Sequence, residues 1–121
     1  QVQHGGVQRE RHAIAEHYIE SEVMFNYSFR IISMQARGIV PNYEASTSKM
    51  YHSELVQRVS RTAIKAYGLY SNVWDPDEKW AAQKGLFTQS NVHSVVGTIA
   101  GGSSEIQRNI IATRGLGLPR G

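Results

Sequence analysis

Two long proline-free stretches decide the fold, and the first is residues 7–37, VQRERHAIAEHYIESEVMFNYSFRIISMQAR. This stretch also lacks glycine, and its apolar residues recur at spacings of three, four and seven, the pattern of a helix with one apolar face. The stripe consists of Ile14, Tyr18, Phe25, Phe29, Ile32 and Ala36, with Val23 and Ile31 close by. A long amphipathic helix is therefore predicted over residues 7–37.

The second stretch, residues 42–68, predicts an antiparallel partner. Gly38 suits a left-handed helix cap and Pro41 stops immediate continuation, so the connection is short. Asn42 is the predicted N-cap, with Glu44 in the first turn. The expected buried stripe is Ala45, Met50, Leu55, Val59, Ala63, Ala66 and Tyr67. Two helices of this length favour a helical bundle.

The second half of the chain predicts shorter elements. Residues 71–78 form a loop in which Asp75 and Pro76 are expected to start a short helix that stops before Gly85. Residues 91–99 fit a helix or a strand. The sequence AGGSS at 100–104 breaks the chain before a last helix.

That last helix completes the predicted fold class, which is all-α, an antiparallel four-helix bundle. Ser103 or Ser104 is the expected cap and Glu105 lies in the first turn. Its inward-facing side chains are expected to be Ile106, Ile110 and Ile111. The aromatic side chains expected in the core are Tyr18, Phe25, Phe29, Tyr43, Tyr51 and Tyr67, whereas Trp74 and Trp80 cover the bundle end or face another subunit.

Composition limits the classes of function. The 121 residues suffice for one domain, and 40% hydrophobic residues against 19% charged residues favour a folded core. A net charge of +3 is too small to predict a nucleic-acid or membrane partner. The chain has no cysteine, no apolar run of membrane-spanning length and a polar start, so we expect a cytoplasmic location.

Titratable clusters give weak signals of a site. The histidines have no metal-site spacing, and they are His4, His12, His17, His52 and His93. The acidic residues Asp75, Asp77 and Glu78 lack the other features of a calcium loop, so helix capping is the favoured interpretation. No metal site is predicted. The basic stripe of Arg58, Arg61 and Lys65 fits a solvated helix face or a phosphate-rich partner.

The most informative segment is residues 98–120, TIAGGSSEIQRNIIATRGLGLPR. It places a glycine pair before two hydroxyl residues at a helix start. Glycines let a backbone approach a ligand closely, and free amide groups favour acceptor groups. The alternative is that these glycines only turn the chain and these serines only cap the helix.

The same segment resembles the C-terminal signature of acyl-CoA dehydrogenases. The similar residues are GGSSEIQRNIIA at 101–112 and GLGLPR at 115–120. A second block, formed by YEAS at 43–46, Lys49, SEL at 53–55 and QRV at 57–59, resembles a long helix of the same family in the correct order. The resemblance covers residues 9–120.

The resemblance implies that residues 1–121 are the C-terminal helical bundle of a three-domain flavoprotein. The family oxidises an acyl-CoA to a trans-2-enoyl-CoA: a glutamate removes the α-proton and the β-hydrogen leaves as hydride to FAD. Electrons then pass to an electron-transfer flavoprotein. Family members are dimers or tetramers in which this bundle supplies much of the subunit contact.

Site residues follow from the matched positions. Ser103, Ser104 and Glu105 match the segment that contacts FAD, and Gly101 and Gly102 match the backbone beside the thioester of the acyl-CoA substrate. Gly68 matches a glycine that approaches the ADP portion of FAD from a neighbouring subunit. Two departures accompany it, because Leu69 replaces a second glycine and Lys65 replaces a glutamine.

The catalytic base has no counterpart at the usual position, which is Gly101 here. Glycine carries no side chain that could accept a proton, and Glu105 belongs to the flavin contact. The catalytic residues are therefore unknown, and the base is expected on a helix upstream of Gln1 or on another subunit. The first hypothesis is that this chain is part of an FAD-dependent acyl-CoA dehydrogenase. The alternative is that it is a non-catalytic assembly or partner subunit of a hetero-oligomeric dehydrogenase. An unrelated helical adaptor is a remote third reading.

Overall fold

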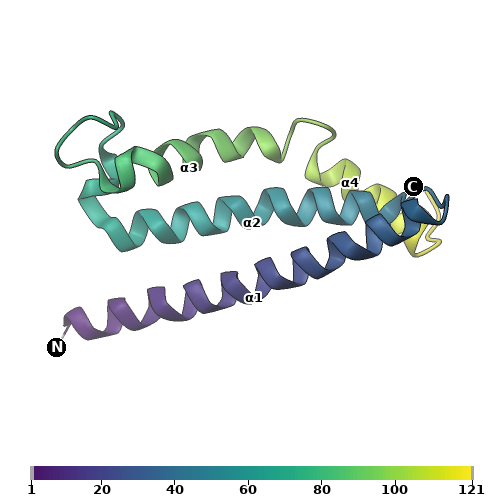
Figure 1. Ribbon diagram of the computed structural model, residues 1–121, viewed down its shortest axis with the longest axis horizontal. Coiled ribbons are helices and arrows are strands. Elements are labelled where there is room, and N and C mark those ends of the chain that lie inside the picture. The colour runs from purple at the N-terminus through teal and green to yellow at the C-terminus, as the bar shows by residue number, and fades with distance from the viewer. Residues whose placement is uncertain (1, 121) are drawn as a thin grey trace.

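The computed structural model describes residues 2–120, with side chains from residue 9 onward, and this part of the chain is all-helical. The helices are α1 (Val2–Ala36), α2 (Tyr43–Tyr67), α3 (Leu86–Gly97) and α4 (Ser104–Ile110). Three single turns complete the list: η1 (Gly68–Asn72), η2 (Ala82–Gly85) and the π-helical η3 (Ile111–Gly115). Figure 1 shows α1 and α3 on opposite sides of α2. The predicted all-α class is confirmed.

The turn between α1 and α2 has the predicted glycine cap at the end of α1 but lacks the predicted asparagine cap at the start of α2. Gly38 has a φ of 72°, and its amide donates to Gln35 O while that of Ile39 donates to Met34 O, so the glycine cap is confirmed. The prediction of Asn42 as a side-chain cap is wrong. Asn42 has helical backbone angles (φ −94°, ψ −75°) and its side chain makes no capping bond, because capping requires extended backbone.

Helix α1 leaves most of its predicted apolar stripe exposed in this chain, and Ile14 and Phe25 line hollows that they share with residues of α2 and α3. Tyr18, Phe25 and Phe29 are 67%, 62% and 54% exposed, so the prediction that these aromatics lie in the core is wrong within this chain. The physical reason is that α1 packs chiefly against α2. The face it uses is half-buried and partly polar, and it consists of Ala13, His17, Glu20, Met24, Tyr27, Ile31 and Met34.

Helix α2 is the central element, and small residues let its neighbours approach closely. Ser46, Ser53 and Ser60 are buried and lie seven residues apart, so they share one face. Ser60 Oγ donates to Val56 O at 2.8 Å and lies 3.1 Å from Ser90 Oγ on α3. Of the predicted stripe, Leu55 is buried and Met50, Val59, Ala63 and Tyr67 are half-buried, whereas Ala45 and Ala66 are exposed.

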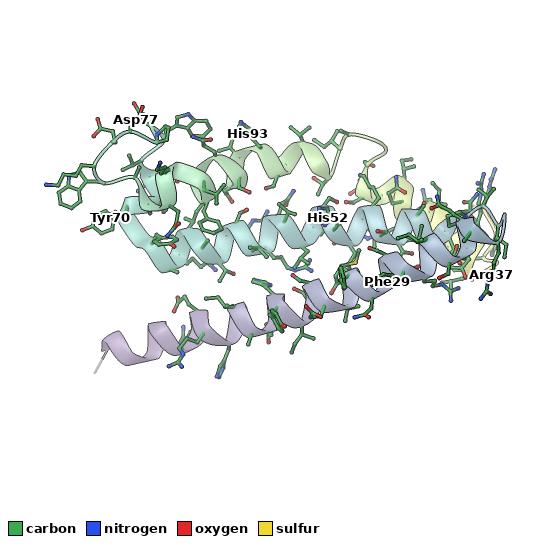
Figure 2. All side chains as sticks on the ribbon, in the orientation of Figure 1. Phe29, Arg37, His52, Tyr70, Asp77 and His93 are labelled. Carbon is green, nitrogen blue, oxygen red and sulfur yellow. The ribbon has the colours of Figure 1, made fainter. Side chains whose placement is uncertain are left out.

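The segment between α2 and α3 differs from its prediction. Asp75 does not start a helix; its Oδ1 accepts from Asp77 N at 3.0 Å and its carbonyl from Glu78 N at 3.3 Å, which makes a tight turn. Helix α3 begins at Leu86, so the helical alternative for residues 91–99 is confirmed with an earlier start. In Figure 2, Tyr70 and Asp77 lie at the end of the bundle away from Phe29 and Arg37.

Candidate functional site at the turn before α4

The predicted break at residues 100–104 is a tight turn between α3 and α4. Gly101 and Gly102 have φ values of 68° and 94°, a region that favours glycine. The turn closes through a hydrogen bond from Ser104 N to Thr98 O at 3.1 Å. Both glycines are therefore required by backbone conformation, which agrees with the prediction of a sharp break.

Side chains from α2 and α4 hold the carbonyl groups of Gly101 and Gly102 in this turn. Lys49 Nζ on α2 donates to Gly102 O. Gln107 on α4 is buried, and its Nε2 donates to Gly101 O at 3.0 Å and to Gly102 O at 3.5 Å. The turn is thus tied to α2 and α4 by its acceptors.

The amide groups of the same turn are left free. The N–H groups of Gly101, Gly102 and Ser103 donate to no acceptor within the residues that the structure describes. Successive free amides next to residues of positive φ form a concavity that suits an acceptor oxygen or an anion. The turn therefore has free donors, while the carbonyls of Gly101 and Gly102 are occupied.

Helix α4 begins with the three predicted flavin-contact residues. Ser103 is the N-cap, because its Oγ accepts from Ile106 N at 3.4 Å. Glu105 lies in the first turn, and hydrogen bonds from the Ser103 hydroxyl and from its own backbone amide lower the pKa of its carboxyl. Ser104 is buried, and its Oγ has no hydrogen-bond partner among the described residues. A buried hydroxyl without a partner is uncommon and calls for an explanation.

The inward orientation predicted for α4 holds only in part. Ile110 and Ile111 are half-buried, but Ile106 is 52% exposed, so its predicted inward position is wrong. The buried positions of the first two turns belong to Ser104 and Gln107 instead. Because Gln107 turns toward the glycine pair, Ile106 lies on the outer face of the helix.

A polar hollow of about 500 Å³ lies between α2 and α4. Ser103, Ser104 and Glu105 line it together with Arg58, Arg61 and Arg108, and the remaining lining residues are Glu54, Gln57, Thr98 and Ile99. Two of the three arginines form ion pairs, since Arg58 donates to Glu20 and Arg108 to Glu54, both at 2.6 Å. Arg61 instead donates to the uncharged amide oxygen Oε1 of Gln57 at 3.0 Å. Part of the predicted basic stripe therefore faces this hollow.

Gly68 is not brought to this hollow. It follows α2, 19 residues beyond Lys49, which corresponds to about 28 Å along the helix. Its φ is 57°, and a Cβ built on it meets nothing within 4 Å. Leu69 and Tyr70 beside it are exposed. The two predicted flavin-contact regions are therefore separate within one chain.

Two carboxylates on the long helices, Glu20 and Glu44, are poorly suited to removing a proton. Glu20 accepts from His17, Tyr51 and Arg58 at 3.0, 3.1 and 2.6 Å. Desolvation alone would raise the pKa of Glu20, but these three hydrogen bonds lower it. Glu44 is buried, and its carboxylate lies 3.2 Å from Arg30. Desolvation would raise the pKa of Glu44, but hydrogen bonds from its own backbone and from its neighbours lower it.

Sequence reasoning assigned no role to Lys49, Gln107 or Glu20. Lys49 lies 53 residues from the carbonyl that it contacts, and Glu20 lies 38 residues from Arg58. Local patterns give no signal for contacts at such separations. Across the described chain, no three His, Asp or Glu side chains gather as a metal site would require, and none of the helices combines the length and hydropathy needed to span a bilayer.

Comparison with known proteins places this geometry in a family. Residues 4–116 match the family described as acyl-CoA dehydrogenase, C-terminal domain. The chain belongs to the acyl-CoA dehydrogenase family. It is 35% identical over 81 residues to acyl-CoA dehydrogenase FadE29 of Mycobacterium tuberculosis, covering 64% of this chain and 19% of that protein.

Two solved structures share the fold. A G363A variant of the Tcur3481-Tcur3483 steroid ACAD has a TM-score of 0.84 and 27% identity, covering 97% of this chain and 31% of that chain. The ChsE4-ChsE5 complex from Mycobacterium tuberculosis has a TM-score of 0.82 and 25% identity, covering 93% and 29%. The chain thus spans about a third or less of each of these relatives.

Proposed function

We propose that this chain is part of an FAD-dependent acyl-CoA dehydrogenase that oxidises an acyl-CoA to a trans-2-enoyl-CoA. The observation that carries the proposal is the turn at residues 101–105, which combines free amides, a buried hydroxyl without a partner and a polar hollow. Family membership gives this combination its meaning. The role of this chain is to contact the flavin and to supply subunit contacts.

The residues present fit FAD, a ligand rich in hydroxyls, carbonyl oxygens and phosphates. Ser103 and Ser104 would hold it, and the unpartnered Oγ of Ser104 gains a partner. Glu105, whose lowered pKa keeps it charged, accepts from a hydroxyl donor. Gly68 would meet the ADP portion of FAD from a neighbouring subunit. When bound, the flavin accepts the hydride from the β-carbon of the substrate.

Gly101 and Gly102 would lie beside the thioester of the acyl-CoA. Neither has a side chain to obstruct it, and a Cβ on Gly101 would meet only Lys49 Cε, 4.0 Å away. A free amide can donate to the thioester oxygen, which gains negative charge as the α-proton leaves. The substrate is expected to approach the turn from its donor side.

The proton acceptor lies outside the residues described here under this proposal. Gly101 occupies the usual position of the base, and Glu20 and Glu44 are weakened as bases by their hydrogen-bond donors. We expect the base on an upstream helix of the same polypeptide or on a partner subunit. An electron-transfer flavoprotein is the expected electron acceptor, and the cytoplasm the expected location.

Assembly into a homo- or hetero-oligomer, either a dimer or a tetramer, is part of the proposal. The exposed stripe of α1, which includes Tyr18, Phe25 and Phe29, is larger than isolated surface residues account for. Two of the structures that share the fold carry the names of two polypeptides each, Tcur3481-Tcur3483 and ChsE4-ChsE5. These observations support contact with a further domain or subunit.

A second candidate function is a non-catalytic bundle that acts as the assembly or partner subunit of a hetero-oligomeric dehydrogenase. The observation in its favour is the glycine at the base position. In that case a partner subunit supplies the base, and this chain contributes shape and contacts. The two candidates differ in whether this polypeptide binds flavin.

The deciding experiment uses the full-length protein, purified with any subunit that accompanies it. We expect a yellow protein with stoichiometric FAD whose flavin absorbance bleaches on addition of an acyl-CoA. Straight-chain and steroid acyl-CoA thioesters tested in parallel would identify the substrate class. A colourless oligomer that takes up no FAD would contradict the proposal and favour the assembly subunit.

A further inference from the structure

The carbonyl groups of Gly101 and Gly102 are held by side chains from two helices that flank the turn. Lys49 comes from α2 and Gln107 from α4, and both are donors. Figure 1 shows the α3–α4 connection on the same side of α2 as α3. The contacts are close, because a Cβ on Gly102 would lie 2.7 Å from Gln107 Nε2.

Peptide planarity converts these contacts into control of the amides. In a trans peptide the carbonyl of one residue and the N–H of the next point in opposite directions within one plane. Fixing the carbonyl of Gly101 therefore fixes the N–H of Gly102, and fixing the carbonyl of Gly102 fixes the N–H of Ser103. These are two of the three amides that have no acceptor among the described residues.

Glycine makes such control necessary. Two adjacent glycines sample more backbone conformations than any other pair, and a ligand that orders them must offset the lost entropy. A turn that is already ordered binds its ligand more tightly, because this cost has been removed in advance. Lys49 adds a charged donor, which makes its hydrogen bond stronger than a neutral one.

We propose that Lys49 and Gln107 are positioning residues that orient the amides of Gly102 and Ser103 toward an acceptor oxygen of the ligand. The acceptor is a flavin oxygen or the thioester oxygen of an acyl-CoA, and the inference rests on the proposed function. Neither side chain touches the reacting atoms. Their effect is transmitted through the two peptide groups that they hold.

The test compares Lys49→Met and Gln107→Leu with two controls in the full-length protein. Lys49→Arg retains a charged donor. Gln89→Leu is the matched control for Gln107→Leu, because Gln89 Nε2 donates to a backbone carbonyl, Trp74 O, at 3.1 Å in another region. Three quantities are measured: amide hydrogen exchange over residues 98–104 without flavin, FAD affinity, and the KM and kcat for acyl-CoA.

We expect Lys49→Met and Gln107→Leu to accelerate exchange over residues 98–104. If the amides donate to a flavin oxygen, FAD affinity should fall about ten- to a hundredfold, the usual effect of losing a hydrogen bond of this kind. If they donate to the thioester oxygen of the acyl-CoA, KM should rise by a similar factor and FAD affinity should stay unchanged. Lys49→Arg should retain most of the wild-type exchange protection and affinity, and Gln89→Leu should match the wild type.

Two results would overturn the proposal. Variants whose exchange over residues 98–104 equals that of the wild type would show that these side chains do not order the turn. Faster exchange with unchanged FAD affinity and unchanged KM would show that the order serves the fold alone. Failure of the proposed function is recognised separately, because the wild-type protein itself would then bind neither FAD nor acyl-CoA.

Discussion

Two parts of this chain are proposed to contact flavin, the turn before α4 and Gly68, and the structure builds them differently. At residues 98–105 the carbonyls are held by Lys49 and Gln107, and Ser104 is buried. At Gly68 the amide donates to Ile64 O and the carbonyl accepts from Ser71 Oγ at 2.6 Å, but a Cβ on Gly68 meets nothing within 4 Å and Leu69 is 85% exposed. The first segment is held in part by a side chain from a helix distant in sequence, whereas Gly68 is held by close sequence neighbours and has an open side.

The difference indicates where each contact is completed. A turn tied to two helices keeps its shape without help, so its ligand meets a preformed surface. The open side of Gly68 gains a neighbour only from another molecule. Tyr70 and Trp80 stack there with ring centroids 5.8 Å apart and both remain exposed. This agrees with the expectation that Gly68 meets flavin held by a neighbouring subunit.

The largest expected effect comes from Gly102→Val. A valine at a φ of 94° is strained, and its Cβ would lie 2.7 Å from Gln107 Nε2, so the Gln107 side chain must leave the carbonyls that it holds. We expect FAD affinity to fall by about a hundredfold or more and the protein to lose roughly 2–4 kcal/mol of stability. Flavin titration and thermal unfolding measure the two effects.

Gly97→Ala is the matched control for that change. Gly97 lies within α3 and a Cβ on it would contact Ser53 Cβ at an ordinary 3.5 Å. We expect near wild-type flavin affinity from this variant. Wild-type affinity in Gly102→Val would instead show that the shape of the turn is irrelevant to flavin binding.

Gly68→Leu tests the exposed segment and should have a smaller effect. Its positive φ costs about 1–2 kcal/mol, and no neighbouring atom obstructs the side chain within the chain. In the assembled protein the leucine should obstruct the flavin and lower FAD affinity about tenfold. Equal flavin affinity in Gly68→Leu and the wild type, measured on the intact oligomer, would remove Gly68 from the site.

Glu20→Gln should affect stability more than ligand binding. Glu20 joins α1 to α2 through Tyr51 and Arg58; Arg58 lines the polar hollow, whereas Glu20 is not among its lining residues. Loss of its charged hydrogen bonds should cost about 1–3 kcal/mol of stability, which thermal unfolding measures. Flavin affinity should fall far less than in Gly102→Val, and an equal loss in the two variants would contradict this prediction.

The pH dependence of that stabilisation has a definite sign. Because the folded state lowers the pKa of Glu20 from its usual 4.5, the stabilisation is complete well above pH 4.5 and is lost as the pH falls through the folded pKa. Wild-type protein should therefore lose more stability than Glu20→Gln on acidification below that value. Parallel unfolding curves for the two proteins would contradict the assignment.

Elements with strong local signals could be predicted from the sequence. Gly38 and Pro41 marked the end of α1 because backbone conformation is a local property. Ser103 or Ser104 was predicted as the cap of α4 for the same reason, and Ser103 is the residue that caps it. The short helix at Asp75 failed because an aspartate next to proline stabilises an isolated turn as readily as a helix start.

Burial and the supports of the site could not be predicted in this way. The apolar period of α1 identified a helix, but it did not show that Tyr18 and Phe25 remain more than half exposed in this chain. The residues of the turn were recognised from their resemblance, whereas Lys49 as a support was not, since its partner lies far along the sequence. Contacts of this kind depend on packing that no local pattern specifies.

The most direct test of the flavin-binding turn is Ser104→Ala in the full-length protein, measured with and without FAD. Without FAD, removal of a buried hydroxyl that has no partner should leave the melting temperature unchanged or raise it. With FAD, affinity should fall about tenfold, because the proposal has this hydroxyl contact the flavin. Unchanged affinity together with a lower melting temperature would contradict the account, because the hydroxyl would then serve the fold and not the flavin.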